Sequence, residues 1–348
     1  MKALTFRGKE NIQLEEIRDP AIIHPSDAIV KVKACAICGS DLHVYHERER
    51  GIDPGTAMGH EFTGEVVEVG KEVRQIRVGQ KVMSPFTTSC GQCFYCRQGL
   101  TCRCIHSQLF GWVERGQGLH GGQSEYVRVP LADSTLVEIP EGISTEEALL
   151  LGDVLSTGYF CALQAEVKPS GVYAVVGCGP VGLMAVVAAR YLGASKVYAI
   201  DTVAERLAKA KEFGAIPADA TVGNPMEEIL EATEGRGADG TLEAVGSGSA
   251  VKLAFDLVRP GGIVSSVGVC NDPHVAFSPV EAYNKNLTYR IGRCPARFLM
   301  DKLIPLVKGR QYDLASIFTH RMKLSEGRAG YEIFAGKKDH CLKVLLEP

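Results

Sequence analysis

The stretch VYAVVGCGPVGLMAVVAARYLG, residues 172–193, decides the fold of this chain. An apolar run typical of a buried strand, VYAVVG (172–177), leads into a glycine-rich turn, and a helical segment follows at 181–193. The pattern G-x-G-x-x-G between a strand and a helix is typical of a dinucleotide-binding βαβ unit. Its glycines make the turn, let the backbone approach a pyrophosphate, and allow the helix to pack closely on the strand. We therefore predict a dinucleotide site formed by Gly177, Gly179, Pro180, Val181 and Gly182.

An acidic residue follows this motif at the expected distance. Asp201 ends the next predicted strand, where a carboxylate should hold the ribose hydroxyls of the adenosine. The same carboxylate repels a 2′-phosphate, so NAD is favoured over NADP. Arg206 lies one helical turn further on, and we place it on the adenine side. The alternative is a glycine-rich turn followed by an unrelated aspartate at a helix N-cap.

On either side of this motif, the chain shows two different secondary-structure patterns. From about residue 170, apolar strands alternate with helices, which requires a parallel sheet covered by helices. Before about residue 150, short runs of period two predict antiparallel strands at 28–34, 64–70, 79–85 and 124–130. These patterns predict an α/β chain in which an antiparallel β-domain precedes a dinucleotide domain.

Composition excludes several classes of protein. The chain has 348 residues, 45% of them hydrophobic, enough for two folded domains. The net charge is −3 and no block of like charge occurs, which argues against nucleic-acid and membrane surfaces. The start, MKALTFRGKE, shows no signal peptide, and glycines interrupt the most apolar span. We expect a cytoplasmic protein without a membrane or nucleic-acid partner.

Cysteines are concentrated in one short segment. The spacing Cys90-x2-Cys93-x2-Cys96-x7-Cys104 offers four thiolates, as closed structural zinc sites require, and Cys102 is a possible competitor for the last position. An iron–sulfur cluster is disfavoured because the last gap is seven residues and no proline follows it. A redox disulfide is the other alternative. We interpret the scattered cysteines as small buried hydrophobic residues: Cys35, Cys161, Cys178, Cys270, Cys294 and Cys341.

A second set of potential ligands is dispersed along the chain. Cys38 lies in CGSDLH (38–43), His60 and Glu61 in GHE (59–61), and Asp153 follows Gly152. Spacing alone does not bring them together. Taken together beside a dinucleotide domain, they fit an open catalytic zinc site with cysteine, histidine and carboxylate ligands.

The motifs resemble those of the zinc-dependent medium-chain alcohol dehydrogenases. The following segments occur in the same order as in that family: CGSDLH (38–43), MGHEFTGEV (58–66), the four-cysteine loop, GDVLSTGY (152–159) and GCGPVG (177–182). The chain is most similar to the bacterial branch, which includes secondary-alcohol, threonine, polyol and formaldehyde dehydrogenases. The resemblance implies a GroES-like catalytic domain over 1–154, a Rossmann coenzyme domain over 155–292 and a return to the catalytic domain over 293–348. It also implies a homotetramer, with a dimer as the next alternative.

The resemblance also implies metal ligands. Cys38 and His60 would bind the catalytic zinc, and Glu61 would be a variable ligand that enters or leaves during turnover. Asp153 stands where liver-type enzymes have a cysteine, as in some bacterial members that use a carboxylate. Asp41 matches the carboxylate that orients the imidazole of His60.

Further roles follow from the same resemblance. Ser40 matches the hydroxyl that bonds the substrate oxygen, and His43 the outer end of a proton relay. Thr157 and Val267 are expected at the cofactor. Phe86, Trp112 and Cys294 are candidates for the substrate pocket, although Trp112 could equally be a core aromatic.

We therefore expect an enzyme with two zinc ions per chain that transfers a hydride between an alcohol and NAD, giving the aldehyde or ketone. Polyol, threonine and formaldehyde dehydrogenases of the same family share all of these motifs and stay open as alternatives. A non-enzymatic relative would have lost the catalytic ligands, and a zinc-free reductase would lack both cysteine clusters. This chain has the ligands and the clusters, which argues against both alternatives.

Overall fold

The computed structural model describes residues 1–348 and divides the chain into two units. The first unit joins Met1–Ser156 with Pro295–Pro348, and the second is Thr157–Cys294. The boundaries expected from the sequence, after residues 154 and 292, lie two residues earlier in each case.

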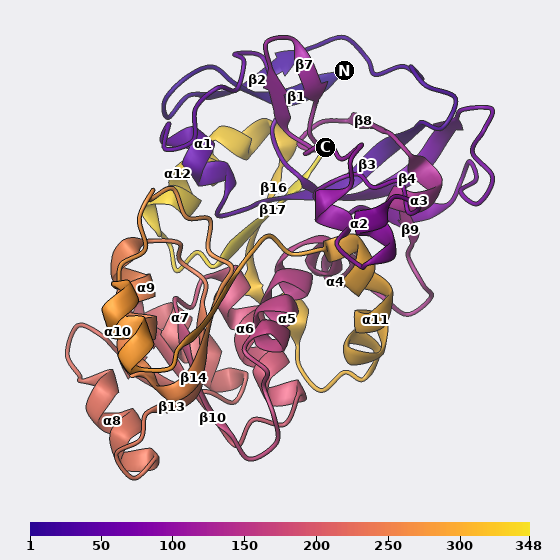
Figure 1. The fold of residues 1–348 in the computed structure, drawn as a ribbon. Coiled ribbons are helices and arrows are strands. Elements are labelled where there is room, and N and C mark those ends of the chain that lie inside the picture. The colour runs from indigo at the N-terminus through magenta and orange to yellow at the C-terminus, as the bar shows by residue number, and fades with distance from the viewer. The chain divides into compact units, whose positions relative to one another are not determined.

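The first unit is built on antiparallel β-structure (Figure 1). Its main sheet has the order β16-β17-β3-β4-β5-β9, with β8 also paired to β3. All pairs in this sheet are antiparallel except β16–β17. The strands are β3 (Ala28–Ile37), β4 (Glu61–Val69), β5 (Lys81–Met83), β8 (Tyr126–Val129), β9 (Val137–Glu138), β16 (Phe318–Lys323) and β17 (Lys343–Glu347). Two small sheets pair β1 (Lys2–Phe6) with β2 (Ile12–Glu16) and β6 (Trp112–Glu114) with β7 (Gln117–Leu119). The four period-two runs are thus β3, β4, β5 and β8, as predicted.

The end of the chain returns to this unit as a central strand. The apolar segment 341–346 forms β17, which pairs with β3 in the register Val344↔Ile37 and Leu346↔Cys35. The yellow β17 accordingly runs beside the purple β3 in Figure 1. Both strands contribute buried side chains to one hydrophobic core. Any polar side chain that β17 turns inward is therefore buried next to the end of β3.

Short helices connect these strands. They are α1 (Asp41–Tyr45), α2 (Phe94–Arg97), α3 (Ala132–Thr135), α4 (Thr145–Gly152), α11 (Ala296–Lys308) and α12 (Gly327–Gly336), with 3-10 turns η1 (Thr101–Arg103), η2 (Leu314–Ile317) and η3 (Leu324–Glu326). A capping box starts α4, in which Ser144 and Glu147 satisfy each other's backbone N–H groups. The helix ends at Gly152, and Asp153 follows at the break before α5 (Val154–Gln164).

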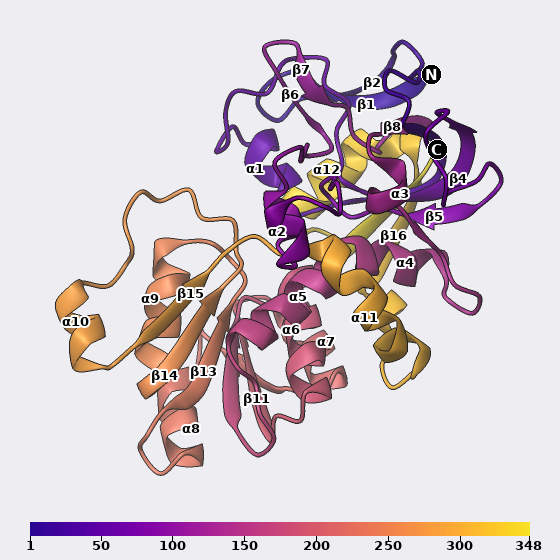
Figure 2. The same cartoon turned by 45° about the vertical axis from the view of Figure 1, so that its right-hand side comes forward.

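The second unit is a doubly wound parallel sheet (Figure 2). Its order is β12-β11-β10-β13-β14-β15, and all five pairs are parallel. The strands are β10 (Val172–Val176), β11 (Lys196–Asp201), β12 (Ile216–Asp219), β13 (Ala238–Glu243), β14 (Val258–Ser266) and β15 (Thr288–Ile291). The helices after α5 are α6 (Pro180–Tyr191), α7 (Ala204–Glu212), α8 (Pro225–Ala232), α9 (Gly248–Leu257) and α10 (Pro279–Asn284). Strand order reverses beside β10, and ligands of such sheets bind at the carboxyl ends of the strands at this point.

No helix of the chain combines the length and the apolar character that a membrane crossing needs.

Candidate metal and dinucleotide sites

The glycine-rich turn lies at the carboxyl end of β10, where the strand order reverses. Gly177 has φ +87°, and a Cβ on it would lie 2.3 Å from Cγ2 of Val245. A Cβ on Gly182 would lie 1.7 Å from the carbonyl oxygen of Gly177, so α6 packs directly on the turn. At Gly179, the N-cap of α6, a Cβ would meet nothing closer than Arg206 Nη1 at 3.9 Å. The helix N-terminus is thus open, which fits a pyrophosphate that approaches its free N–H groups.

Asp201 is held rigidly beside this turn. One carboxylate oxygen accepts the N–H of Cys178 at 2.6 Å, and the other accepts those of Thr202 at 2.7 Å and Val203 at 3.0 Å. Nη1 of Arg206 lies 3.7 Å from the carboxylate, and Nε of Arg206 is buried without a hydrogen-bond partner. The structure therefore brings both residues to the glycine-rich turn.

A buried carboxylate that the sequence analysis did not single out organises the neighbouring loops. Glu243, fully buried at the end of β13, accepts the N–H groups of Val245 at 2.7 Å and Gly246 at 2.6 Å, and a hydrogen bond from the Ser266 hydroxyl. Its carbonyl accepts the N–H of Val267 at 3.0 Å, at the end of β14. A single acid inside the apolar segment TLEAVG was the available signal for this role.

The four clustered cysteines converge in space. The sulfur atoms of Cys90, Cys93, Cys96 and Cys104 all lie within 4.8 Å of one another, and all four are free thiols. The backbone N–H of Cys90 points at Sγ of Cys104 at 3.2 Å, and that of Cys93 at Sγ of Cys90 at 3.4 Å. Cys102 lies in η1, is buried, and is not one of these four. The structure thus places Cys104 and not Cys102 in the cluster.

The electrostatics of this cluster suit a bound cation. Backbone N–H groups of Cys96 and Ile105 lower the pKa of Cys93 to about 6. Burial raises the pKa of Cys96 to about 12 and also raises that of Cys104. Cys96 and Cys104 therefore stay protonated unless a cation stabilises their thiolates, and four sulfurs at this spacing fit tetrahedral zinc.

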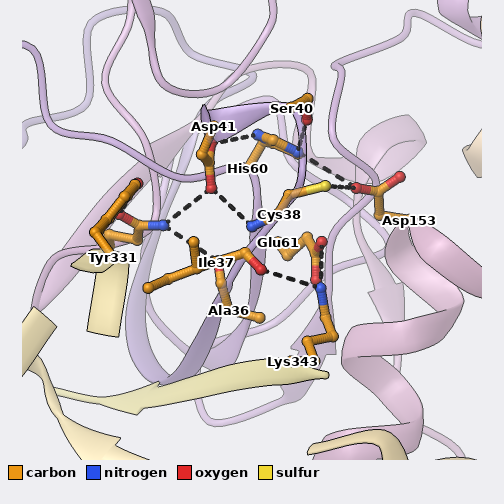
Figure 3. Close-up of polar contacts among 11 residues, drawn as sticks. Ala36, Ile37, Cys38, Ser40, Asp41, His60, Glu61, Asp153, Tyr331 and Lys343 are labelled. Carbon is orange, nitrogen blue, oxygen red and sulfur yellow. Dashed lines mark hydrogen bonds and ion pairs between the residues drawn. The ribbon is translucent and has the colours of Figure 1, made fainter. Parts of the chain in front are cut away.

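The second group of ligands meets at the ends of β3 and β4 (Figure 3). Cys38 follows β3 and His60 precedes β4, and the antiparallel pairing of these strands makes them neighbours. Asp153 joins them from the break between α4 and α5, 3.3 Å from both Sγ of Cys38 and Nε2 of His60. The ligand atoms of Cys38, His60, Glu61 and Asp153 all lie within 4.8 Å of one another. The structure therefore assembles residues that spacing alone did not connect.

Two glycines determine where these ligands lie. Gly59 has φ +88°, and a Cβ on it would lie 2.3 Å from Cγ of Gln123. A Cβ on Gly152 would lie 2.3 Å from the carbonyl oxygen of Ser84. The backbone before His60 and before Asp153 therefore packs more closely than any side chain would allow.

Asp41 connects the ligands to a deeper hydrogen-bond network. One oxygen lies 3.2 Å from Nδ1 of His60, and the other accepts the N–H of Cys38 at 2.9 Å. Gln123 donates to Asp41 at 3.2 Å, and Tyr331 donates to Gln123 at 2.9 Å. With Nδ1 bonded to Asp41, Nε2 of His60 is directed to the ligand cluster, as metal-binding histidines require. The sequence analysis identified Asp41 and missed Gln123 and Tyr331.

Burial and neighbouring charges have opposing effects on the pKa values of the residues in this cluster. Burial raises the pKa of Cys38 to about 12. Burial opposes the charge on His60, but Asp41 and Asp153 raise its pKa well above 6.5. Burial also favours neutral Asp153, and His60 overcomes this and lowers its pKa. Oε2 of Glu61 is buried without a hydrogen-bond partner. Zinc prefers the donors that this cluster offers, which are one sulfur, one imidazole nitrogen and two carboxylates. The unpartnered oxygen of Glu61 also lacks the partner that a zinc ion would provide.

The predicted proton-relay residues lie on α1. Ser40 is its N-cap, with Oγ 3.2 Å from Nε2 of His60, so the hydroxyl is at the ligand cluster. His43 is half-buried on the same helix. Burial lowers its pKa, and the charges of Arg48 and His46 lower it further, so its ring is neutral at neutral pH.

The remaining candidates are placed as follows. Phe86 lies edge-on to His60 with ring centroids 6.3 Å apart. Trp112 packs against the hydrophobic core of the first unit, in keeping with the core alternative. Thr157 and Cys294, the first and last residues of the second unit in the sequence, are both buried.

Comparisons with known proteins identify the family. The model for the alcohol dehydrogenase GroES-like domain matches residues 24–141, and the model for zinc-binding dehydrogenases matches residues 180–303. Zinc-type alcohol dehydrogenase B of Aspergillus flavus is 41% identical over 349 residues, covering 97% of this chain and 79% of that protein. The chain belongs to the zinc-dependent medium-chain alcohol dehydrogenases. It is therefore an oxidoreductase of this zinc-dependent class, as the resemblance implied.

Solved structures agree with this family. Alcohol dehydrogenase TADH from Thermus sp. ATN1 is 40% identical with a TM-score of 0.93, covering 100% of this chain and 99% of that chain. Two more distant relatives have solved structures that contain nicotinamide cofactors. In each comparison, the match covers 100% of this chain and 99% of the other chain. A zinc-binding dehydrogenase from Sinorhizobium meliloti is bound to NADP (27% identity, TM-score 0.84), and an alcohol dehydrogenase from Escherichia coli is complexed with NADH (26%, 0.85). Zinc and a nicotinamide cofactor are thus properties of this family.

Proposed function

We propose that this chain is an NAD-dependent alcohol dehydrogenase with two zinc ions per chain. Cys38, His60 and Asp153 hold the catalytic ion, with Glu61 as a variable ligand. The four cysteines of the loop, Cys90, Cys93, Cys96 and Cys104, hold the structural ion. The observation that carries the proposal is the convergence of the four catalytic donors within 4.8 Å, buried and beside an unpartnered carboxylate oxygen.

The residues around the catalytic donors have separate roles in the proposed alcohol oxidation. When bound, zinc supplies a Lewis acid for the alcohol oxygen and the nicotinamide accepts the hydride. The Ser40 hydroxyl, beside His60, accepts the alcohol proton and passes it toward His43. Asp41 holds the ring of His60 so that Nε2 stays directed at the donor cluster.

Cofactor preference depends on Asp201. Its carboxylate lies beside the glycine-rich turn and is fixed by three backbone N–H groups, so it offers ribose hydroxyls an immobile acceptor. The same negative charge repels the 2′-phosphate of NADP. Arg206 contributes to the adenine side. Thr157 packs against the nicotinamide, as the family resemblance implies, and Val267 also binds the cofactor.

Steady-state kinetics with both cofactors test this preference. We expect Asp201→Ala to raise the Michaelis constant for NAD about tenfold, since bonds to a charged acceptor contribute about 1.5–3 kcal/mol, and to improve the use of NADP. Asp219→Ala, which removes the carboxylate at the end of the neighbouring strand β12, is the matched control and should change neither. A wild-type enzyme that already prefers NADP would show that Asp201 does not have this role.

We further propose that the substrate is a small alcohol and the product its aldehyde or ketone. Reduction of NAD with ethanol, 2-butanol, sorbitol, threonine and formaldehyde compares the substrate classes of the family. A clear preference for sorbitol, threonine or formaldehyde would replace the simple alcohol by that class.

We also propose that the chain assembles as a homotetramer. Light scattering should then give four times the chain mass of 37.5 kDa, and twice that mass would indicate the dimer instead.

A further inference from the structure

The last strand of the chain brings a lysine into the catalytic ligand cluster. Lys343 begins β17, is 0% exposed, and its Nζ lies 2.8 Å from Oε1 of Glu61 and 3.3 Å from the carbonyl oxygen of Ile37. Glu61 is also 0% exposed. Lysine is almost never fully buried unless it is paired. This ion pair joins residues that lie 282 positions apart in the sequence.

The two oxygens of Glu61 have different surroundings. Oε1 is bonded to the Lys343 ammonium, whereas Oε2 is buried and has no hydrogen-bond partner. Figure 3 shows Glu61 between Lys343 on one side and Cys38 and Asp153 on the other. A ligand atom of Glu61 lies within 4.8 Å of those of Cys38, His60 and Asp153. Glu61 is thus placed between two positively charged partners, the lysine and the proposed metal.

Charge counting shows why the lysine matters. A thiolate from Cys38 and carboxylates from Glu61 and Asp153 carry three negative charges, and a divalent cation balances only two of them. Buried charges without partners are strongly unfavourable. The Lys343 ammonium supplies the missing positive charge, so Glu61 has a partner even when the metal does not hold it.

We propose that Lys343 is the positioning residue that keeps Glu61 a weak, displaceable ligand of the catalytic metal. The ammonium holds one oxygen of Glu61 and competes with the metal for its negative charge, which leaves the other oxygen to approach or leave the ion. Without this competition, Glu61 becomes a permanent ligand. The inference rests on the proposed function, because it requires a metal at Cys38, His60 and Asp153.

The test measures zinc release from the holoenzyme. Purified protein is mixed with the chelating dye 4-(2-pyridylazo)resorcinol, and the absorbance of the zinc complex is followed while samples are assayed for turnover. Zinc that leaves together with turnover comes from the catalytic site. We expect Lys343→Met to slow the release of this catalytic zinc about tenfold, a size typical of changes next to metal ligands. The same variant should lower kcat. Lys343→Arg keeps the charge and should release zinc at nearly the wild-type rate.

Control variants separate this role from a structural one. Lys323→Met makes the same change at an exposed position of the neighbouring strand β16 and should have no effect. In a Glu61→Gln background, Lys343→Met should not change the release rate, because the competing carboxylate is gone. If Lys343→Met does not fold, Lys343→Gln takes its place. Glutamine can still donate a hydrogen bond to Glu61 but carries no charge, so this variant should also slow zinc release.

Two results would overturn the inference. One is zinc release from Lys343→Met that is as fast as, or faster than, release from wild type. The other is an effect of Lys343→Met that is the same with and without Glu61. A wild-type protein that releases no zinc in step with its turnover would instead contradict the proposed function.

Discussion

At the scale of single residues, the proposed proton path depends on the ionisation of His43. Burial and the charges of Arg48 and His46 lower its pKa, so the neutral ring persists to a pH below the ordinary value of 6.5. A neutral imidazole can accept a proton from the Ser40 side, and a charged one cannot. Turnover should therefore fall only when the pH drops through this lowered pKa.

We expect His43→Gln to lower kcat about tenfold to a hundredfold near neutral pH, because glutamine bonds its neighbours but does not titrate. Added imidazole buffer should restore part of the rate, and zinc content should stay unchanged. His24→Gln makes the same change at an exposed histidine that does not act on the pKa of His43, and it is the matched control. If His43→Gln raises only the Michaelis constant for NAD, with the pH profile and buffer response unchanged, His43 binds the ribose and is no part of a relay.

Sequence reasoning succeeded for residues whose partners are local. The glycine motif and the four cysteines each lie within a short segment, so spacing carried the information. It missed Gln123, Tyr331 and Lys343, whose side chains act on residues far away in the sequence. Tyr331 bonds to Gln123 across 208 positions, and no local pattern marks such a pair. The one available signal was a lysine inside the apolar segment CLKVLL.

At the scale of elements, the end of α4 places Asp153 in the cluster. A Cβ on Gly152 would lie 2.3 Å from the Ser84 carbonyl oxygen, so the helix end must shift to accept one. We expect Gly152→Ala to destabilise the fold by about 1–3 kcal/mol and to lower zinc content toward one ion per chain. Thermal unfolding and metal analysis check this. Gly39→Ala is the control, since its Cβ would meet nothing within 4 Å. Equal behaviour of the two variants would show that close packing at Gly152 does not position Asp153.

The loop that carries α2 and η1 should act as a separate stabilising element. Cys93→Ser removes one of its four converging sulfurs, so this site should lose its zinc and the unfolding temperature should fall. Turnover per folded molecule should change much less, because the catalytic donors are different residues. Cys102→Ser alters a nearby buried cysteine outside the four and should keep both ions. Zinc loss from Cys102→Ser with none from Cys93→Ser would contradict the assignment of the cluster.

The types of the elements were predictable where periodicity was strong. The strands and helices around the glycine motif, and the period-two runs of the first unit, follow the sequence pattern closely. The order of strands in the first unit was not predictable. It places β17 between β16 and β3, a pairing between the two ends of the chain that local patterns do not encode.

At the scale of the whole molecule, the chain leaves the first unit, forms the second, and returns. This return completes the surroundings of the proposed metal site, because Tyr331 and Lys343 both come from the segment Pro295–Pro348. The residues of the proposed catalytic centre are therefore distributed over almost the full length of the sequence. The similarity to relatives likewise extends over nearly the whole chain and is not limited to one of the two units.

The central claim is that Cys38, His60 and Asp153 hold a catalytic zinc ion distinct from that of the cysteine loop. Metal analysis of wild type and Cys38→Ser, combined with alcohol-dependent NAD reduction by the same samples, tests it most directly. We predict about two zinc ions per chain in wild type, since each site offers four donors. Cys38→Ser should keep about one and lose measurable turnover while staying folded. A wild-type protein with a single zinc ion, or a Cys38→Ser variant that keeps both ions and its turnover, would contradict the account.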